Sequence, residues 1–232
     1  MKKTILLLAV ASVTACTTVN YTSPGFPDAA QDHRMIAVLP VEMVFTGVVP
    51  RGLEAADIER IEEGESLAFQ ATLYNYLLDR SSTHRRNPIR IAIQPVELTL
   101  MRLDQEDLAI RDTWALPAKE LAELLGVDAV VRTRVRKTRY LSDLASYGIG
   151  VGLHVVHEAT NGEYDWLLPW GMTKTYDVFA EGELLAAEDG ALLWKVVVHR
   201  ATDWTQPAND VVRGITRKLA KKFPYRGDSM AG

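Results

Sequence analysis

Three arginines at alternate positions, Arg132, Arg134 and Arg136, form the clearest chemical pattern in the chain. They continue an apolar run that predicts a β-strand, and side chains two residues apart lie on the same face of a strand. One face is therefore expected to carry three planar guanidinium groups, which suit carboxylates, phosphates or an acidic protein surface. The alternative is a solvated strand face that a neighbouring strand with Glu181 and Glu183 neutralises.

A second candidate site contains His154, His157 and Glu158. Imidazole and carboxylate groups are common metal ligands, and in a helix two residues three positions apart would share a face. Glycine-rich flanks on both sides argue against such a helix. A zinc site needs about three protein ligands, but only two histidines lie here, and no further ligand clusters with this segment. We therefore expect no metal and no cofactor.

The sequence predicts an insertion at residues 143–170, which is apolar and glycine-rich and carries Trp166 and Trp170. Its glycines lack the spacing and the Gly-Lys-Ser/Thr ending of phosphate-binding loops. We predict a mobile flap whose tryptophans contact a partner or the headgroup zone of a membrane. A loop packed on the core is the alternative. A membrane-spanning hairpin is disfavoured, because the alternation is poor and residues 162–170 are short for a spanning strand of about nine to eleven residues.

Signatures of catalysis are missing from the sequence. We find no G-x-S-x-G, no HExxH, no cysteine nucleophile with a histidine partner and no phosphate-binding loop. Acidic pairs such as Glu62 and Glu63 fit a solvated surface. The protein is therefore expected not to be an enzyme.

The single cysteine, Cys16, follows a short basic start and an apolar run. Lys2 and Lys3 come first, and the apolar run is about nine residues long, which suits a signal peptide and is far short of the roughly 20 residues of a membrane span. Ala15 directly before Cys16 resembles the lipobox of bacterial lipoproteins. This resemblance implies cleavage before Cys16 and acylation of its thiol and of the new amino terminus. The alternative is an ordinary secretory signal that leaves Cys16 as a free thiol.

The resemblance also implies a location, and the pattern of the sequence predicts a domain plan. Thr17 after the cysteine implies sorting to the outer membrane, with the protein facing the periplasm. We expect a signal peptide at residues 1–15, a lipidated cysteine with a flexible tether at 16–34, one globular domain at 35–226 and a disordered tail at 227–232.

Composition supports a globular protein without nucleic acid as a partner. The 232 residues are 47% hydrophobic and 24% charged, which is too apolar for disorder. The net charge of −4 becomes −6 when residues 1–15, with Lys2 and Lys3, are removed, so there is no global basic field.

Hydrophobic patterns predict an α+β (mixed α/β) domain with a single mixed sheet and helices packed on it. Asp189 and Gly190 predict a hairpin turn, and Gly126 is expected to end a helix. In the first helix, one stripe is expected to face the core: Leu67, Ala71, Tyr74 and Leu78. Strands are predicted at residues 35–41, 89–93, 127–136, 176–186 and 192–201, and helices at 54–78, 116–125 and 210–223.

Four segments together resemble a group of small envelope lipoproteins: MIAVLPVE, LAELLGVDAVVRTRVR, AEGELLAAEDGALLWKVVVHRAT and VVRGITRKLAKKF. The group shares the fold of the TolB N-terminal domain, CsgG and LpoB. The resemblance covers most of residues 35–223 and implies an adaptor or assembly protein that acts by binding other proteins.

The sequence thus leads to one main functional hypothesis and two others. The main one is a lipid-anchored, non-enzymatic adaptor or assembly factor of the cell envelope, with Arg132, Arg134, Arg136, Trp166 and Trp170 as partner contacts. A homo-oligomeric secretion or pore component of the CsgG type is the alternative. An envelope hydrolase comes last, because its motifs are absent.

Overall fold

The computed structural model describes residues 20–47, 54–82, 88–139, 174–203 and 208–226. Its strands form one mixed sheet, which confirms the predicted fold class. The strands are β1 (Asn20–Thr22), β2 (Met35–Val38), β3 (Glu42–Gly47), β4 (Ala92–Ile93), β5 (Ala129–Arg139), β6 (Lys174–Ala186) and β7 (Leu192–Asp203). The helices are α1 (Phe26–Asp32), α2 (Ala55–Ser82), α3 (Val96–Gln105), α4 (Asp112–Ala115), α5 (Ala118–Leu125) and α7 (Ala208–Lys222).

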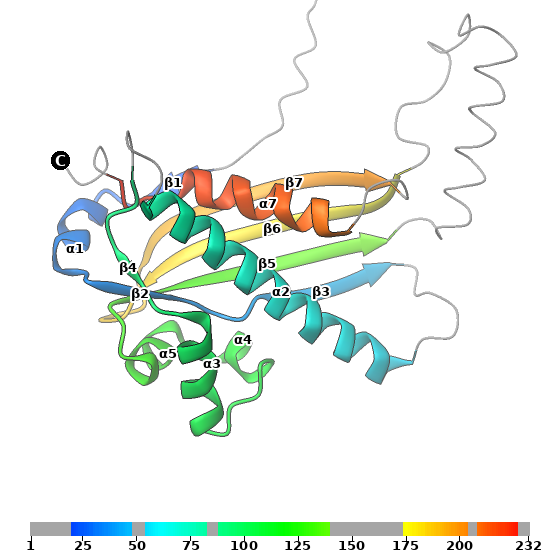
Figure 1. Ribbon diagram of the computed structural model, residues 1–232, viewed down its shortest axis with the longest axis horizontal. Helices are drawn as coiled ribbons and strands as arrows, with labels where there is room; N and C mark the ends of the chain where they lie inside the picture. Colours follow the sequence, from blue (N-terminus) through cyan, green and yellow to red (C-terminus); the bar gives the residue numbers. More distant parts are fainter. Residues whose placement is uncertain (1–19, 48–53, 83–87, 140–173, 204–207, 227–232) are drawn as a thin grey trace, which may run out of the picture.

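The sheet is ordered β1-β7-β6-β5-β2-β4, and β3 also pairs with β5 (Figure 1). The strands β2 and β3 run parallel to β5 and pair with successive parts of it. The strand predicted at residues 35–41 therefore ends early, at Val38, and resumes as β3. Pro40 lies in the interruption and has no N–H to donate to a ladder. The Gln70 side chain donates to the Val38 carbonyl, 2.7 Å away, and so satisfies it.

The predicted hairpin is confirmed in β6 and β7, which pair antiparallel on either side of a turn. Gly190 in this turn has a φ of 73°, a left-handed conformation that glycine adopts without strain. The strands β5, β6 and β7 form the long central part of the sheet.

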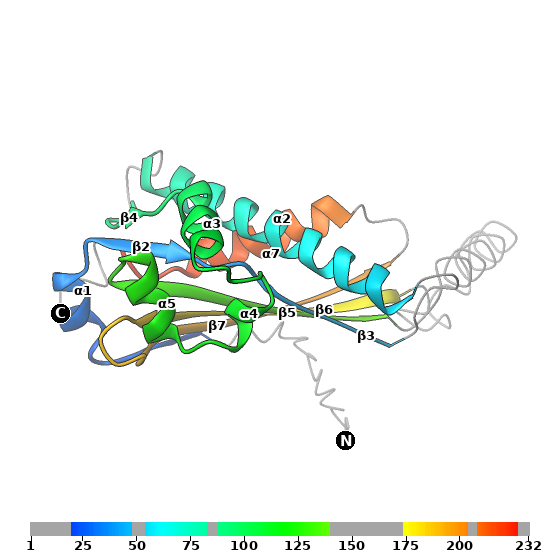
Figure 2. The ribbon, with the colours of Figure 1, turned by 90° about the horizontal axis from the view of Figure 1, so that it is seen from below.

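Helices α2 and α7 lie side by side on one face of this sheet, as both views show (Figures 1 and 2). The amphipathic pattern of residues 210–223 predicts an inner face with five apolar residues: Val211, Val212, Ile215, Leu219 and Phe223. All of them are buried except Val212, which is only partly buried. They join the main core, in which Trp194 is almost fully buried and meets Phe223 edge to face with ring centroids 5.4 Å apart.

The predicted inner stripe of α2 is wrong. Leu78 is 42% exposed, and Leu67, Ala71 and Tyr74 are only partly buried. The face that packs on the sheet is one position earlier along the helix and includes two polar residues: Ser66, Phe69, Gln70, Leu73 and Leu77. Apolar residues occur all around α2, so periodicity alone does not select the inner face.

A second, smaller core lies on the opposite face of the sheet. Helices α3 and α5 pack there against Ala37, Leu39 and Val130 at one end of the strands. Gly126 follows α5 with a φ of 59°, which confirms its predicted role at the end of that helix. Figure 2 shows α5 on the side of the sheet opposite α2 and α7. The helix α3 was not among the predicted elements.

The N-terminal segment belongs to the fold. Strand β1 pairs with β7, and α1 buries Phe26 and Ala30 in the main core. The predicted flexible tether at residues 16–34 is therefore wrong for residues 20–34. Phe26 contributes to this attachment, because one buried aromatic ring removes a large apolar area from water.

A contact between His33 and Tyr225 attaches the C-terminal end of this segment to the main core. The Tyr225 hydroxyl and His33 Nδ1 are hydrogen-bonded, and Asp128 Oδ2 accepts the backbone N–H groups of Arg34 and Met35 at 2.7 and 2.8 Å. Burial lowers the pKa of His33, with Asp128 acting in the opposite direction, and burial raises the pKa of Tyr225. Both groups are therefore neutral at pH 7.

Several predicted features lie outside the described residues. These are the signal peptide at 1–15 with the lipidation site Cys16, the insertion at 143–170 with Trp166 and Trp170, the histidines His154 and His157, and the tail at 227–232.

Candidate functional site

Within the described part of the chain, the sheet face opposite α2 and α7 is covered by α3 and α5 at one end only. We use the term uncovered face for ten residues in the remaining part of it: Glu42, Val44, Arg134, Arg136, Phe179, Glu181, Glu183, Lys195, Val197 and His199. Strand pairing arranges these side chains in rows, since directly opposite residues share a face. One row is Val44, Arg136, Phe179 and His199 across β3, β5, β6 and β7.

The three predicted arginines lie on this side of β5, but their environments differ. Arg132 is half-buried, and its guanidinium donates to the Leu116 carbonyl just before α5. Burial lowers the pKa of Arg132, and Glu183 partly opposes this effect. Arg132 therefore holds the α4–α5 connection on the sheet and is not presented to a partner.

Arg134 is exposed and forms an ion pair across β3 and β5. Its Nε donates to Glu42 Oε2 at 2.6 Å, and this hydrogen bond raises the pKa of Arg134. Glu181 lies directly opposite Arg134 on β6, as the alternative interpretation required. The side chains of Glu181 and Glu183 instead form ion pairs with Lys195 on β7, at 2.7 Å and 3.0 Å respectively. Sequence reasoning missed both Glu42 and Lys195.

Arg136 stacks on an aromatic ring. Its guanidinium carbon lies 5.3 Å from the centroid of the Phe179 ring. The imidazole of His199 also stacks on the Phe179 ring, with the two ring centroids 4.4 Å apart and an angle of 13° between the ring planes. His199 Nε2 is 2.6 Å from Asp177 Oδ1. We call Arg136, Phe179 and His199 the stack. The sequence predicted the strands that carry these residues, but it did not predict that the three would be directly opposite one another.

A shallow hollow of about 400 Å³ lies beside the stack. Apolar and charged side chains line it together. The lining includes Val44, Arg134, Arg136, Phe179, Glu181 and Val197. Such a mixture of apolar groups and fixed charges suits recognition of a side chain from another molecule.

Similar folds occur among solved structures of bacterial proteins, while no protein-family profile and no curated protein matches the chain. A variant of PelC from Paraburkholderia phytofirmans, a dodecamer, is 13% identical over 89% of this chain and 96% of its own, with a TM-score of 0.43. Lipoprotein GNA1162 from Neisseria meningitidis is 13% identical over 81% and 94%, with a TM-score of 0.41. The LpoB C-terminal domain from Salmonella enterica is 12% identical over 77% and 94%, with a TM-score of 0.38.

These low identities and TM-scores carry no argument about function. The likeness to LpoB agrees with the resemblance stated from the sequence, whereas the likeness to CsgG and TolB stays a prediction. The function must therefore be argued from the residues of this chain.

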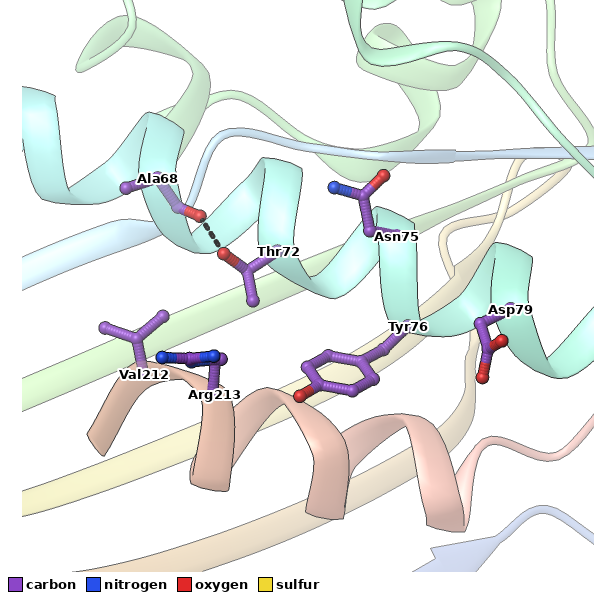
Figure 3. Close-up of a pocket in the computed structure, with 7 residues that line it drawn as sticks. All are labelled: Ala68, Thr72, Asn75, Tyr76, Asp79, Val212 and Arg213. Carbon is purple, nitrogen blue, oxygen red and sulfur yellow. Dashed lines mark hydrogen bonds between the residues drawn. The ribbon is translucent and has the colours of Figure 1, made fainter. Parts of the chain in front are cut away.

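A second hollow, of about 430 Å³, lies between α2 and α7 (Figure 3). Tyr76 of α2 reaches towards α7, and Val212 and Arg213 form the opposite wall. Two of the polar groups here are engaged within their own helices. The Thr72 hydroxyl donates to the Ala68 carbonyl at 2.7 Å, and Arg213 donates to Asp210 at 3.0 Å. This hollow is therefore a weaker candidate than the uncovered face.

The described residues offer neither a metal site nor a membrane-spanning helix. No group of three or more His, Cys, Asp or Glu side chains there could hold a metal ion. None of the described helices combines the length and the apolar character needed to cross a membrane.

Proposed function

We propose that the protein is a lipid-anchored, non-enzymatic adaptor or assembly factor of the cell envelope, which binds another protein through the uncovered face. The observation that carries this proposal is the Arg134–Glu42 pair beside the hollow, on a part of the sheet that no described helix covers. A sheet face with fixed charges around apolar side chains favours a protein partner, because charge patterns select partners and orient them.

The anchor part of the proposal rests on Cys16 and its N-terminal context. More than one acyl chain on this residue would give stable membrane attachment, where a single chain is marginal. Since β1 begins at Asn20, four residue steps separate it from Cys16. An extended chain spans about 3.5 Å per residue, so β1 would lie within roughly 14 Å of the anchored cysteine.

Tyr21 of β1 is directly opposite Lys195 and thus belongs to the same side of the sheet as the uncovered face. It is 44% exposed. The proposed anchor therefore places the edge of the partner-binding side near the membrane surface, where a membrane-associated partner would be within reach.

The anchor is tested by Cys16→Ser. We expect the variant to leave the membrane fraction and to migrate differently on a denaturing gel, because its acyl chains are missing. If it stays membrane-bound with unchanged mobility, the anchor proposal fails.

The binding part is tested by charge reversal in the full-length chain. Arg134→Glu should reduce co-purification of a defined envelope protein, whereas Arg60→Glu should not, because Arg60 is a similarly exposed, ion-paired arginine on α2. The double variant Arg134→Glu/Glu42→Arg restores the internal ion pair with reversed polarity. Continued loss of the partner in this double variant supports direct contact. Full recovery would mean that the pair acts only on stability and would overturn the proposed role of this face.

A further inference from the structure

Arg136 differs from every other basic side chain on the uncovered face. Arg134 is bonded to Glu42, Lys195 to Glu181 and Glu183, and His199 to Asp177. Within the described part of the chain, Arg136 has neither a hydrogen bond nor an ion pair, and its one interaction is with the ring of Phe179. An exposed guanidinium with five N–H donors is thus left available to another molecule.

The stack fixes how this guanidinium is presented. Arg136, Phe179 and His199 are directly opposite one another on three adjacent strands. Phe179 lies between two planar groups, and the bond from His199 to Asp177 holds the far end. A stacked guanidinium loses less conformational entropy when it binds a ligand than a freely rotating one.

The surroundings of Arg136 define the chemistry of what can bind. Val44 is directly opposite it on β3, and Val197 lies on the other side of the hollow. Glu42 and Glu181 are also in the lining, and each is already bonded to a cation. The ligand should therefore carry one negative charge for Arg136 and an apolar group for the valines.

We propose that Arg136 and the adjacent hollow bind a carboxylate with a neighbouring apolar side chain, as in an Asp or Glu beside an apolar residue of a protein partner. This rests on the proposed function and names the partner's chemistry. A carboxylate fits the fork of one guanidinium in a bidentate manner. A phosphate-rich surface such as an anionic membrane fits less well, because Glu42 and Glu181 would repel a denser negative charge.

The test uses side-chain NMR of the arginine Nε–Hε groups in the purified chain from residue 17 onward. Three probes are titrated: acetyl-Glu-Phe-amide, acetyl-Gln-Phe-amide and inorganic phosphate. We expect a saturable shift of the Arg136 signal with the Glu peptide, and binding about tenfold weaker with the Gln peptide, as the loss of one charge-assisted contact implies.

Variants assign the binding to the stack. Arg136→Gln should abolish the response of backbone signals around Val44 and Val197, and Phe179→Leu should weaken binding while the arginine is kept. Arg213→Gln on α7 is the matched control, since this exposed arginine lies in the opposite layer. Equal affinity for the Glu and Gln peptides, tighter binding of phosphate, or undiminished binding by Arg136→Gln would each overturn the proposal.

The outcome is separable from that of the proposed function. If the full-length protein keeps a defined partner that is lost with Arg134→Glu but not with Arg136→Gln, the carboxylate site is wrong and the adaptor function stands. If no variant of the uncovered face affects partner binding, the adaptor function through this face is wrong as well.

Discussion

The ring of Phe26 meets the ring of Tyr225 edge to face, with centroids 5.1 Å apart and an angle of 70° between the planes. This contact joins α1, near the start of the described chain, to the segment that follows α7. Both side chains are fully buried. The N-terminal segment is thus held by the same core as the sheet.

Phe26→Ala tests whether residues 20–34 are part of the domain. Loss of a fully buried aromatic ring should lower the free energy of unfolding by about 3–5 kcal/mol, measured by urea denaturation. Tyr21→Ala, which removes an exposed ring from the same segment, should cost less than about 1 kcal/mol. Equal, small effects of the two changes would instead support a tether that is only loosely attached.

Acid should weaken the fold through His33. Burial keeps the pKa of His33 below 6.5, so the unfolded chain binds this proton more tightly than the folded one. The free energy of unfolding should therefore fall as the pH drops below about 7. It should level off once the pH is below the lowered pKa that His33 has in the folded state. Urea denaturation between pH 7.5 and 5.5 measures this, and His33→Gln should show a flatter dependence. Identical slopes for both proteins would contradict the assignment.

The register of α2 is tested by two neighbouring leucines. Leu77 is fully buried and Leu78 is 42% exposed. Leu77→Ala should cost about 2–5 kcal/mol of unfolding free energy, because it leaves a cavity against the sheet. Leu78→Ala should cost less than about 1 kcal/mol. The reverse order would restore the inner stripe expected from the sequence.

Two glycines should respond to alanine with opposite signs. Gly64 is within α2, and a Cβ there would meet nothing within 4 Å, so Gly64→Ala should stabilise by about 0.5–1 kcal/mol. Gly126 has a positive φ, and a Cβ there would lie 3.0 Å from Arg102 Nη1, so Gly126→Ala should destabilise by roughly 1–2 kcal/mol. Thermal unfolding of both variants measures the two shifts, and a stabilised Gly126→Ala would contradict the helix end described here.

Local signals predicted much of this fold, whereas long-range pairing was beyond them. The Asp189-Gly190 turn and the glycine after α5 are each specified by a few adjacent residues, and both were predicted correctly. The inner face of α2 depends on packing against the sheet, and its buried Ser66 and Gln70 hide it from a hydrophobicity pattern.

The candidate site shows the same division. Alternation along one strand predicted that Arg132, Arg134 and Arg136 share a face. It did not predict that Glu42, 92 residues away from Arg134, would be the ion-pair partner, or that Arg136 would stack on Phe179. Register between distant strands is set by the whole sheet and cannot be read from one of them.

The most direct test of the central claim is photo-crosslinking of the full-length protein in its native envelope. A photoreactive amino acid replaces Val197 on the uncovered face or, as a control, Thr72 in the groove between α2 and α7. We predict a discrete crosslinked protein from position 197 that disappears with Arg134→Glu/Glu42→Arg, and none from position 72. Crosslinks from position 72 alone, or a crosslink from position 197 that the charge swap leaves unchanged, would contradict binding through the uncovered face.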